Sequence, residues 1–193
     1  MTFEEQKQHQ LQKKDQSLQG EIDKEILFLV NKLNELPMFY TTSSCAGRTL
    51  LLSRTSDKKF DVKWIYKDHK EANLKKIKKA LENPPNNPVW LKQESAIVHI
   101  CCKNLETAEK LLIICKHTGF KFSGILSVGK RIIVEVMSSE NIETLVADKE
   151  TLLISKEYLT RMVEECNKKM KRNKARIQRF HDGVVEEFAW QKL

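Results

Sequence analysis

Apolar residues recur at helical spacing in several parts of the chain, and the first two segments lie in its N-terminal half. The first covers residues 22–36 and ends before Pro37, because proline lacks the backbone N–H that a helix interior needs. The second covers residues 74–81, where every third or fourth position is apolar, and Asp68 before it can cap its N-terminus. These patterns predict two amphipathic helices.

Two further helices are predicted in the C-terminal half. One begins after Asn104, a favourable N-cap, and ends at Gly119, which suits a left-handed C-cap. The other is the longest, over residues 156–180. Its buried side is expected to consist of Leu159, Val163, Cys166, Met170 and Ile177.

Alternating apolar and polar residues predict strands between these helices. In the segment 96–102 the alternation places His99 on the face opposite Val98 and Ile100. The prolines of residues 82–88 exclude both helix and central strand there, so we expect a loop. Strands are predicted at 48–54, 61–67, 96–102, 121–126, 131–137 and 144–147. The sequence therefore predicts an α+β fold with a mixed β-sheet flanked by helices and a long C-terminal helix.

Composition bounds the domain organisation. Residues 1–16 are rich in Gln and Lys and are interpreted as a flexible polar tail, and 17–193 as a single α+β domain. If that domain has two lobes, the 82–88 loop is the expected junction. No run approaches the roughly 20 apolar residues of a membrane span, and the polar N-terminus has no signal-peptide core. The five cysteines form no C-x-x-C pair, which favours reduced thiols in the cytoplasm and no metal site.

Positive charge is concentrated in two segments. The net charge is +8, from 34 basic and 26 acidic residues. Residues 58–92 hold ten lysines and four acids, and residues 156–180 hold nine basic residues and three acids. Such clusters favour a nucleic-acid partner, because binding to phosphates releases counterions. A lysine-rich solvated surface is the alternative.

The segment 41–48, TTSSCAGR, concentrates groups that can bind or react. Ser43 and Ser44 offer hydroxyls, Gly47 permits close backbone approach, and Arg48 can hold a phosphate or carboxylate in bidentate fashion. Cys45 could act as a nucleophile, but free cysteines are more often buried packing groups. The sequence predicts a binding site here.

Other candidates lie on the predicted strands. His69 follows one strand and His99 lies within another, and each could act as a base or serve as a structural histidine. Ser123 and Gly124 lie in a strand where a glycine suggests close ligand approach, or a β-bulge. No G-x-G-x-x-G turn follows a predicted strand, so a Rossmann nucleotide site has no support.

Several of these strings together resemble one protein family over residues 15–180. They are DQSLQGEID with Ser17, Gly20 and Asp23, then YTTSSCAGR, WIYKDH, VHI around His99, GFKFSGI, and the ISKEYL…NKKMKRNKARIQRF end. In this respect the chain is similar to the wybutosine-synthesising tRNA methyltransferases, the third enzyme of that pathway. It departs from them at Leu18, where the family commonly has proline, and at 94–96, where ESA replaces EPF.

The resemblance implies a fold, an activity and a partner. It implies a non-Rossmann methyltransferase that uses S-adenosylmethionine to methylate N-4 of the demethylated wyosine-type base 3′ of the anticodon of tRNA-Phe. A non-catalytic, basic RNA-binding module is the alternative, and a Cys45-dependent enzyme is a third reading.

Residue roles follow from the same resemblance and from charge. His69 and His99 are the candidate bases. The candidate substrate- or cofactor-binding residues are Ser17, Gly20, Asp23, Ser43, Ser44, Cys45, Gly47, Arg48, Ser123 and Gly124. Outward cations of the last helix are expected to contact tRNA: Lys168, Lys171, Arg172, Lys174 and Arg179.

Overall fold

The computed structural model describes residues 1–12, 23–54 and 62–188, and these form two compact units. The first unit contains residues 1–46, 96–139 and 173–193, and the second contains 47–95 and 140–172. The chain therefore passes from one unit to the other four times, first between Ala46 and Gly47. The predicted junction at 82–88 is a loop, as expected, but it lies inside the second unit.

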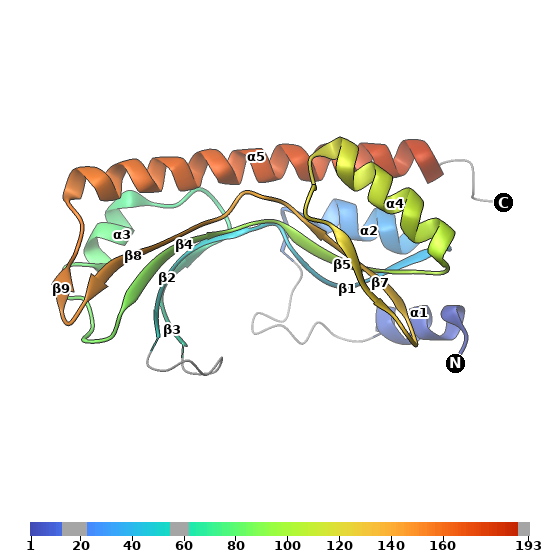
Figure 1. The fold of residues 1–193 in the computed structure, drawn as a ribbon, viewed down its shortest axis with the longest axis horizontal. Coiled ribbons are helices and arrows are strands. Elements are labelled where there is room, and N and C mark those ends of the chain that lie inside the picture. The colour runs from blue at the N-terminus through green and yellow to red at the C-terminus, as the bar shows by residue number, and fades with distance from the viewer. Residues whose placement is uncertain (13–22, 55–61, 189–193) are drawn as a thin grey trace. The chain divides into compact units, whose positions relative to one another are not determined.

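The first unit is built on a four-stranded antiparallel sheet. Its strand order is β1 (Phe39–Cys45), β5 (Ile97–Cys102), β7 (Ile132–Met137) and β6 (Gly124–Val128). Three helical segments cover one face: α2 (Leu27–Glu35), α4 (Leu105–Thr118) and the last part of α5 (Lys156–Phe188) (Figure 1). Alternate strand residues such as Val98 and Val134 join the helices in one apolar core, which excludes water from this face.

On the opposite face of this sheet, α1 (Phe3–Gln12) contacts β1. Residues 1–16 are therefore not simply a polar tail, because they contain this helix. The hydroxyl of Thr2 accepts the N–H of Glu5 at 3.2 Å, and the carboxylate of Glu5 accepts the N–H of Thr2 at 2.8 Å. This reciprocal pair caps the start of the helix. The Phe3 ring packs on Tyr40 with centroids 5.3 Å apart. The helix has no buried residue of its own, and further polar contacts hold it: Gln6 accepts from the Tyr40 hydroxyl, Lys7 donates to the Leu36 carbonyl, and Glu4 pairs with Lys103.

The second unit has a five-stranded antiparallel sheet of its own. The order is β3 (Val62–Asp68), β2 (Arg48–Arg54), β4 (Val89–Glu94), β8 (Ile142–Asp148) and β9 (Thr151–Leu152). Helix α3 (Leu74–Ala80) and the first part of α5 cover one face through Ile77, Leu159 and Val163. The predicted side of the long helix is therefore buried. Its residues belong to two cores, since Leu159 and Val163 lie in the second core and Ile177 lies in the first.

The α+β class and the long C-terminal helix are confirmed, and the single mixed sheet is corrected. The described strands pair only antiparallel, in two separate sheets. The prediction missed β1, whose run of small hydroxyl residues has low apolar content, and it also missed β4 and β9. Helix α5 continues to Phe188, eight residues beyond the predicted end, because Val184 and Phe188 extend its apolar side into the core.

The cap predicted for α3 is also corrected. Asn73, not Asp68, caps this helix by accepting the Lys76 N–H at 3.1 Å. Asp68 is the last residue of β3 and accepts the Lys70 N–H at 2.9 Å, so it closes a turn five residues earlier. Both are good N-cap types, and the hydrophobic period alone did not separate them.

Candidate functional site

The segment TTSSCAGR forms the end of β1 and the start of β2. Gly47 lies between the two strands with φ of 96°, a left-handed conformation that glycine adopts without steric cost. Asp23 Oδ2 accepts the N–H of Ala46 at 3.2 Å, and its other oxygen accepts the N–H of Glu25 at 3.2 Å. Asp23 therefore ties the end of this segment to the chain that leads into α2.

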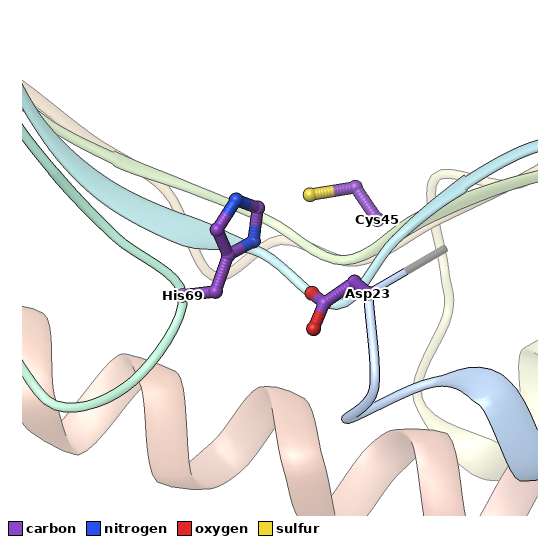
Figure 2. A group of neighbouring side chains, drawn as sticks. All are labelled: Asp23, Cys45 and His69. Atoms are coloured by element: carbon purple, nitrogen blue, oxygen red, sulfur yellow. The ribbon is translucent and has the colours of Figure 1, made fainter. Parts of the chain in front are cut away.

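Cys45 lies beside the same carboxylate (Figure 2). An oxygen of Asp23 and the Sγ of Cys45 are within 4.8 Å of each other, and both side chains are half-buried. Figure 2 also labels His69, which belongs to the second unit and is described with it below.

Three other cysteines are packing groups. Burial raises the pKa of Cys102, Cys115 and Cys166 to about 12. Those three thiols are protonated packing groups.

Side chains of three adjacent strands form a polar row on the face of the first sheet opposite its helices. Ser43 of β1 pairs with His99 of β5, which pairs with Glu135 of β7, which pairs with Gly124 of β6. Ser43 Oγ lies 2.8 Å from His99 Nδ1, and His99 Nε2 lies 2.8 Å from Glu135 Oε2. A hydroxyl, an imidazole and a carboxylate are thus connected in series.

With an ionised carboxylate and a neutral imidazole, the chemistry of these groups favours one arrangement of the protons. An ionised carboxylate only accepts hydrogen bonds, so His99 Nε2 must donate to Glu135. In the neutral imidazole Nδ1 then has a lone pair and accepts from the hydroxyl of Ser43. Ser43 is exposed, while the ring and the carboxylate are 27 and 28% exposed. Ser43 is therefore the end of the row that is accessible to solvent.

The two serines of the segment lie on opposite faces. Ser44 pairs with Val98, a core residue, so alternation places it on the face that the helices cover. Cys45 pairs with Ile97 and shares the face of Ser43. Strand alternation therefore places Ser43 and Cys45 on one face of the sheet and Ser44 on the other, although the sequence analysis assigned all three to one binding site.

Ser123 and Gly124 have separate roles at the other end of the row. Ser123 Oγ accepts the N–H of Met137 at 3.0 Å, which ties the start of β6 to β7. A Cβ at Gly124 would meet no atom within 4 Å, so the space beside the row is open there. The register irregularity between these strands lies between Ile125 and Ser127, so Gly124 does not serve a bulge.

In the second unit, Arg48 begins β2 and is bonded across the sheet. Its Nε donates to Glu94 of β4 at 2.6 Å, and its guanidinium carbon lies 4.9 Å from the centre of the Trp64 ring. Lys67 Nζ lies 4.5 Å from the same ring. The bond to Glu94 uses Nε, and the two terminal NH2 groups of a guanidinium can bind a carboxylate or phosphate end-on.

His69 follows the last residue of β3 and is half-buried. The turn after it is fixed by Tyr66, whose hydroxyl donates to Asp68 at 3.2 Å and accepts the N–H of Asn73 at 2.9 Å. A connection held in this way gives His69 a defined position at the strand end.

The five cations expected on the last helix all have partners. Lys168, Lys171 and Lys174 are paired with Glu165, Glu71 and Glu25 at 3.0–3.6 Å. Arg172 is bonded to Glu140 and Glu165, and these two carboxylates raise its pKa further. Arg179 donates to the carbonyl of Thr118 at 3.4 Å.

Sequence reasoning missed Glu135, Glu94 and Trp64, and it named two residues outside the described structure. Ser17 and Gly20 lie in the undescribed segment 13–22. Glu135 had a signal, since it is the one polar residue in the run IIVEVM, but only the strand register shows that it lies against His99. No helix in the described part of the chain is long and apolar enough to cross a bilayer.

Comparison with known proteins places this fold in a class of methyltransferase that lacks the Rossmann sheet. Residues 5–186 match the family model described as Methyltransferase TYW3, and the chain belongs to that family. It is 34% identical over 169 residues to the tRNA(Phe) 7-((3-amino-3-carboxypropyl)-4-demethylwyosine(37)-N(4))-methyltransferase 1 of Pyrococcus abyssi, covering 86% of this chain and 87% of that protein.

Two further relatives extend the comparison. The tRNA wybutosine-synthesizing protein 3 homolog of Xenopus laevis is 36% identical over 181 residues, covering 91% of this chain and 71% of the relative. The solved structure of the PH1069 protein from Pyrococcus horikoshii superposes with a TM-score of 0.88 at 32% identity, covering 95% of this chain and 96% of that one.

Proposed function

We propose that this protein transfers a methyl group from S-adenosylmethionine to N-4 of the 4-demethylwyosine-type base of tRNA-Phe, in the cytoplasm. The observation that carries this proposal is the family match over residues 5–186. Relatives at 30–34% identity over most of both chains carry the name of this activity. The TTSSCAGR segment that marks the resemblance is intact. A purely phosphate-binding module would not need the hydroxyl–imidazole–carboxylate row.

Residues of the first unit suit the methyl donor. In the first unit, the Asp23 carboxylate suits a cationic amino or sulfonium group, and the open space at Gly124 leaves room beside the polar row. Arg48, in the second unit, is a separate candidate for binding a carboxylate or phosphate. When bound, the donor supplies an activated methyl group. The protein is expected to hold the accepting nitrogen in line, which can lower a barrier by about 7–11 kcal/mol.

A base is needed because the accepting ring nitrogen carries a proton. We propose His99 for this role, with His69 as the other candidate. His99 is supported by its bonded neighbours Ser43 and Glu135, which together form a path for a proton. Cys45 is expected to line the site without forming a bond to the substrate, since methyl transfer needs no covalent relay through the protein.

The proposal is tested with S-adenosylmethionine labelled in its methyl group and tRNA from a strain blocked at this step. Label should appear in the tricyclic base of tRNA-Phe. The same tRNA from a strain with the completed base is the control and should take up none. Absence of label from the blocked tRNA, with the donor shown to bind by calorimetry, would leave the RNA-binding module as the better account.

A further inference from the structure

Glu135 lies where a carboxylate is unusual. It occupies β7 between Val134 and Val136, both fully buried, and points to the opposite face of the sheet. Glutamate is depleted in strands, and a half-buried carboxylate loses part of its hydration. Its described hydrogen bond is the one from His99 Nε2 at 2.8 Å. A residue placed at this cost serves the imidazole beside it.

We propose that Glu135 is a positioning residue that fixes the tautomer of His99, so that the exposed Ser43 hydroxyl is the group that takes the proton from the substrate. This inference rests on the proposed function. By accepting from Nε2–H, Glu135 leaves the lone pair on Nδ1, which faces Ser43. In the other tautomer Nδ1 would carry a hydrogen and could not accept the proton of the hydroxyl.

The proton transfer balances within the row. The N–H bond of the substrate base breaks and its proton bonds to Ser43 Oγ, while the original hydroxyl proton moves to His99 Nδ1. The nitrogen keeps the electron pair with which it bonds the methyl group. The imidazolium that results is adjacent to the Glu135 carboxylate, which stabilises the positive charge. Proton return to water from the exposed end of the row restores the starting state.

Strand pairing places the row independently of these side chains. Backbone pairs join His99 to Ser43 on one side and to Glu135 on the other. Along β5, the neighbours of His99 on the same face of the sheet are Cys101 on the side of α1 and Ile97 on the other side. Removal of the Glu135 charge should therefore change the proton on His99 more than the position of its backbone.

The test measures the tautomer and the turnover separately. Nitrogen-15 spectra of protein labelled at histidine, without ligands, should show His99 with a hydrogen on Nε2 and none on Nδ1. The signal is assigned by its loss in His99→Gln. Glu135→Gln can both donate and accept, so it should give a mixture of tautomers. Its kcat should fall by roughly 10²-fold or more, with KM within about twofold of wild type.

Two other variants complete the experiment. Glu143→Gln removes a half-exposed carboxylate from the second sheet and should leave the His99 signal and kcat unchanged. Ser43→Ala should lower kcat as Glu135→Gln does, yet keep the Nε2–H tautomer, because Glu135 remains. This variant keeps the test decisive if Glu135→Gln does not fold.

Three results would overturn the inference. They are a wild-type His99 with its hydrogen on Nδ1, a Glu135→Gln variant with the wild-type tautomer, or a Ser43→Ala variant that retains full kcat. The spectra do not depend on activity. If wild type methylates no tRNA while the tautomer is as expected, the proposed function fails and the arrangement of the row stands.

Discussion

Gly183 of α5 lies directly against Ile114 of α4. A Cβ added at Gly183 would be 2.9 Å from Ile114 Cγ2, closer than real Cβ contacts allow. Ile114 is 8% exposed and its branched methyl cannot move away freely. The absence of a side chain at this one position therefore sets how closely the two helices pack within the first unit.

The variant Gly183→Ala is expected to destabilise the protein. Alanine gains about 1 kcal/mol over glycine in helix propensity, but overpacking a tight contact costs about 1–3 kcal/mol. We expect a net loss of about 1 kcal/mol in the free energy of unfolding, measured with urea. In an Ile114→Ala background the contact is absent, so the same substitution should stabilise. Stabilisation in both backgrounds would show that the contact relaxes without cost.

The variant Cys45→Ala is expected to retain substantial turnover. Cys45 lies beside Asp23, and the proposed chemistry does not require its thiol to lose a proton or to form a bond with the substrate. Single-turnover rates with labelled donor are the measurement, and donor affinity is the control. A loss in rate above roughly 10³-fold, with affinity unchanged, would instead support covalent chemistry at this thiol.

Replacing Lys171, Arg172 and Lys174 by alanine is expected to flatten the salt dependence of tRNA binding. Each lost phosphate contact removes about one unit of slope on duplex RNA at most. The decrease should be smaller than this here, because all three cations are already paired with glutamates and must exchange partners. Affinity is measured by filter binding at several salt concentrations.

A second triple variant of equal charge is the control for this experiment. Lys75, Lys76 and Lys79 of α3 have no acidic partner within 4 Å among the described residues. If only their replacement flattens the slope, the tRNA lies on α3 and not on α5. If neither variant changes it, neither helix contacts the phosphates.

The variant Tyr40→Phe is expected to make the protein less sensitive to alkaline pH. Burial, followed by the hydrogen bond with Cys101, raises the pKa of Tyr40 to about 12, while Arg131 acts in the opposite direction. The pKa of tyrosine in an unfolded chain is about 10. The folded protein therefore binds more protons between these values, and the stability from Tyr40 is present below pH 10 and lost as pH rises toward 12.

Urea unfolding at pH 9, 10 and 11 measures this effect. The slope of the unfolding free energy against pH should be less steep in Tyr40→Phe, by at most about one proton. Tyr158→Phe, which removes a phenol that is 46% exposed, is the control. Equal slopes for wild type and both variants would contradict the role assigned to Tyr40.

The hydrophobic period predicted most elements because it depends on local spacing. It located β2 and α4 and, apart from its last eight residues, α5, since each has a clear apolar side. It missed β1, where Thr and Ser replace apolar residues on the half-buried side, and it also missed β4 and β9. Composition could not show that the strands divide into two sheets, because strand pairing is set by contacts between distant segments.

The candidate site was predicted in its members but not in its arrangement. His99 was placed opposite Val98 and Ile100, as the structure has it. Its partners Ser43 and Glu135 are 56 and 36 residues away in the chain, so only the register reveals them. Likewise, the outward cations of α5 follow from helical period, but the pairing of Lys171, Arg172 and Lys174 with glutamates outside α5 does not.

The four passages of the chain between its units limit when each unit can form during synthesis. The first core includes Phe39 near one end of the sequence and Ile177, Phe180, Val184 and Phe188 near the other. A nascent chain on the ribosome has the four strands of this sheet once residue 137 is made, but it has no cover for part of their apolar face. The second unit, by contrast, is complete when residue 172 has been made. The unit that begins first in the sequence is therefore the last to close its core.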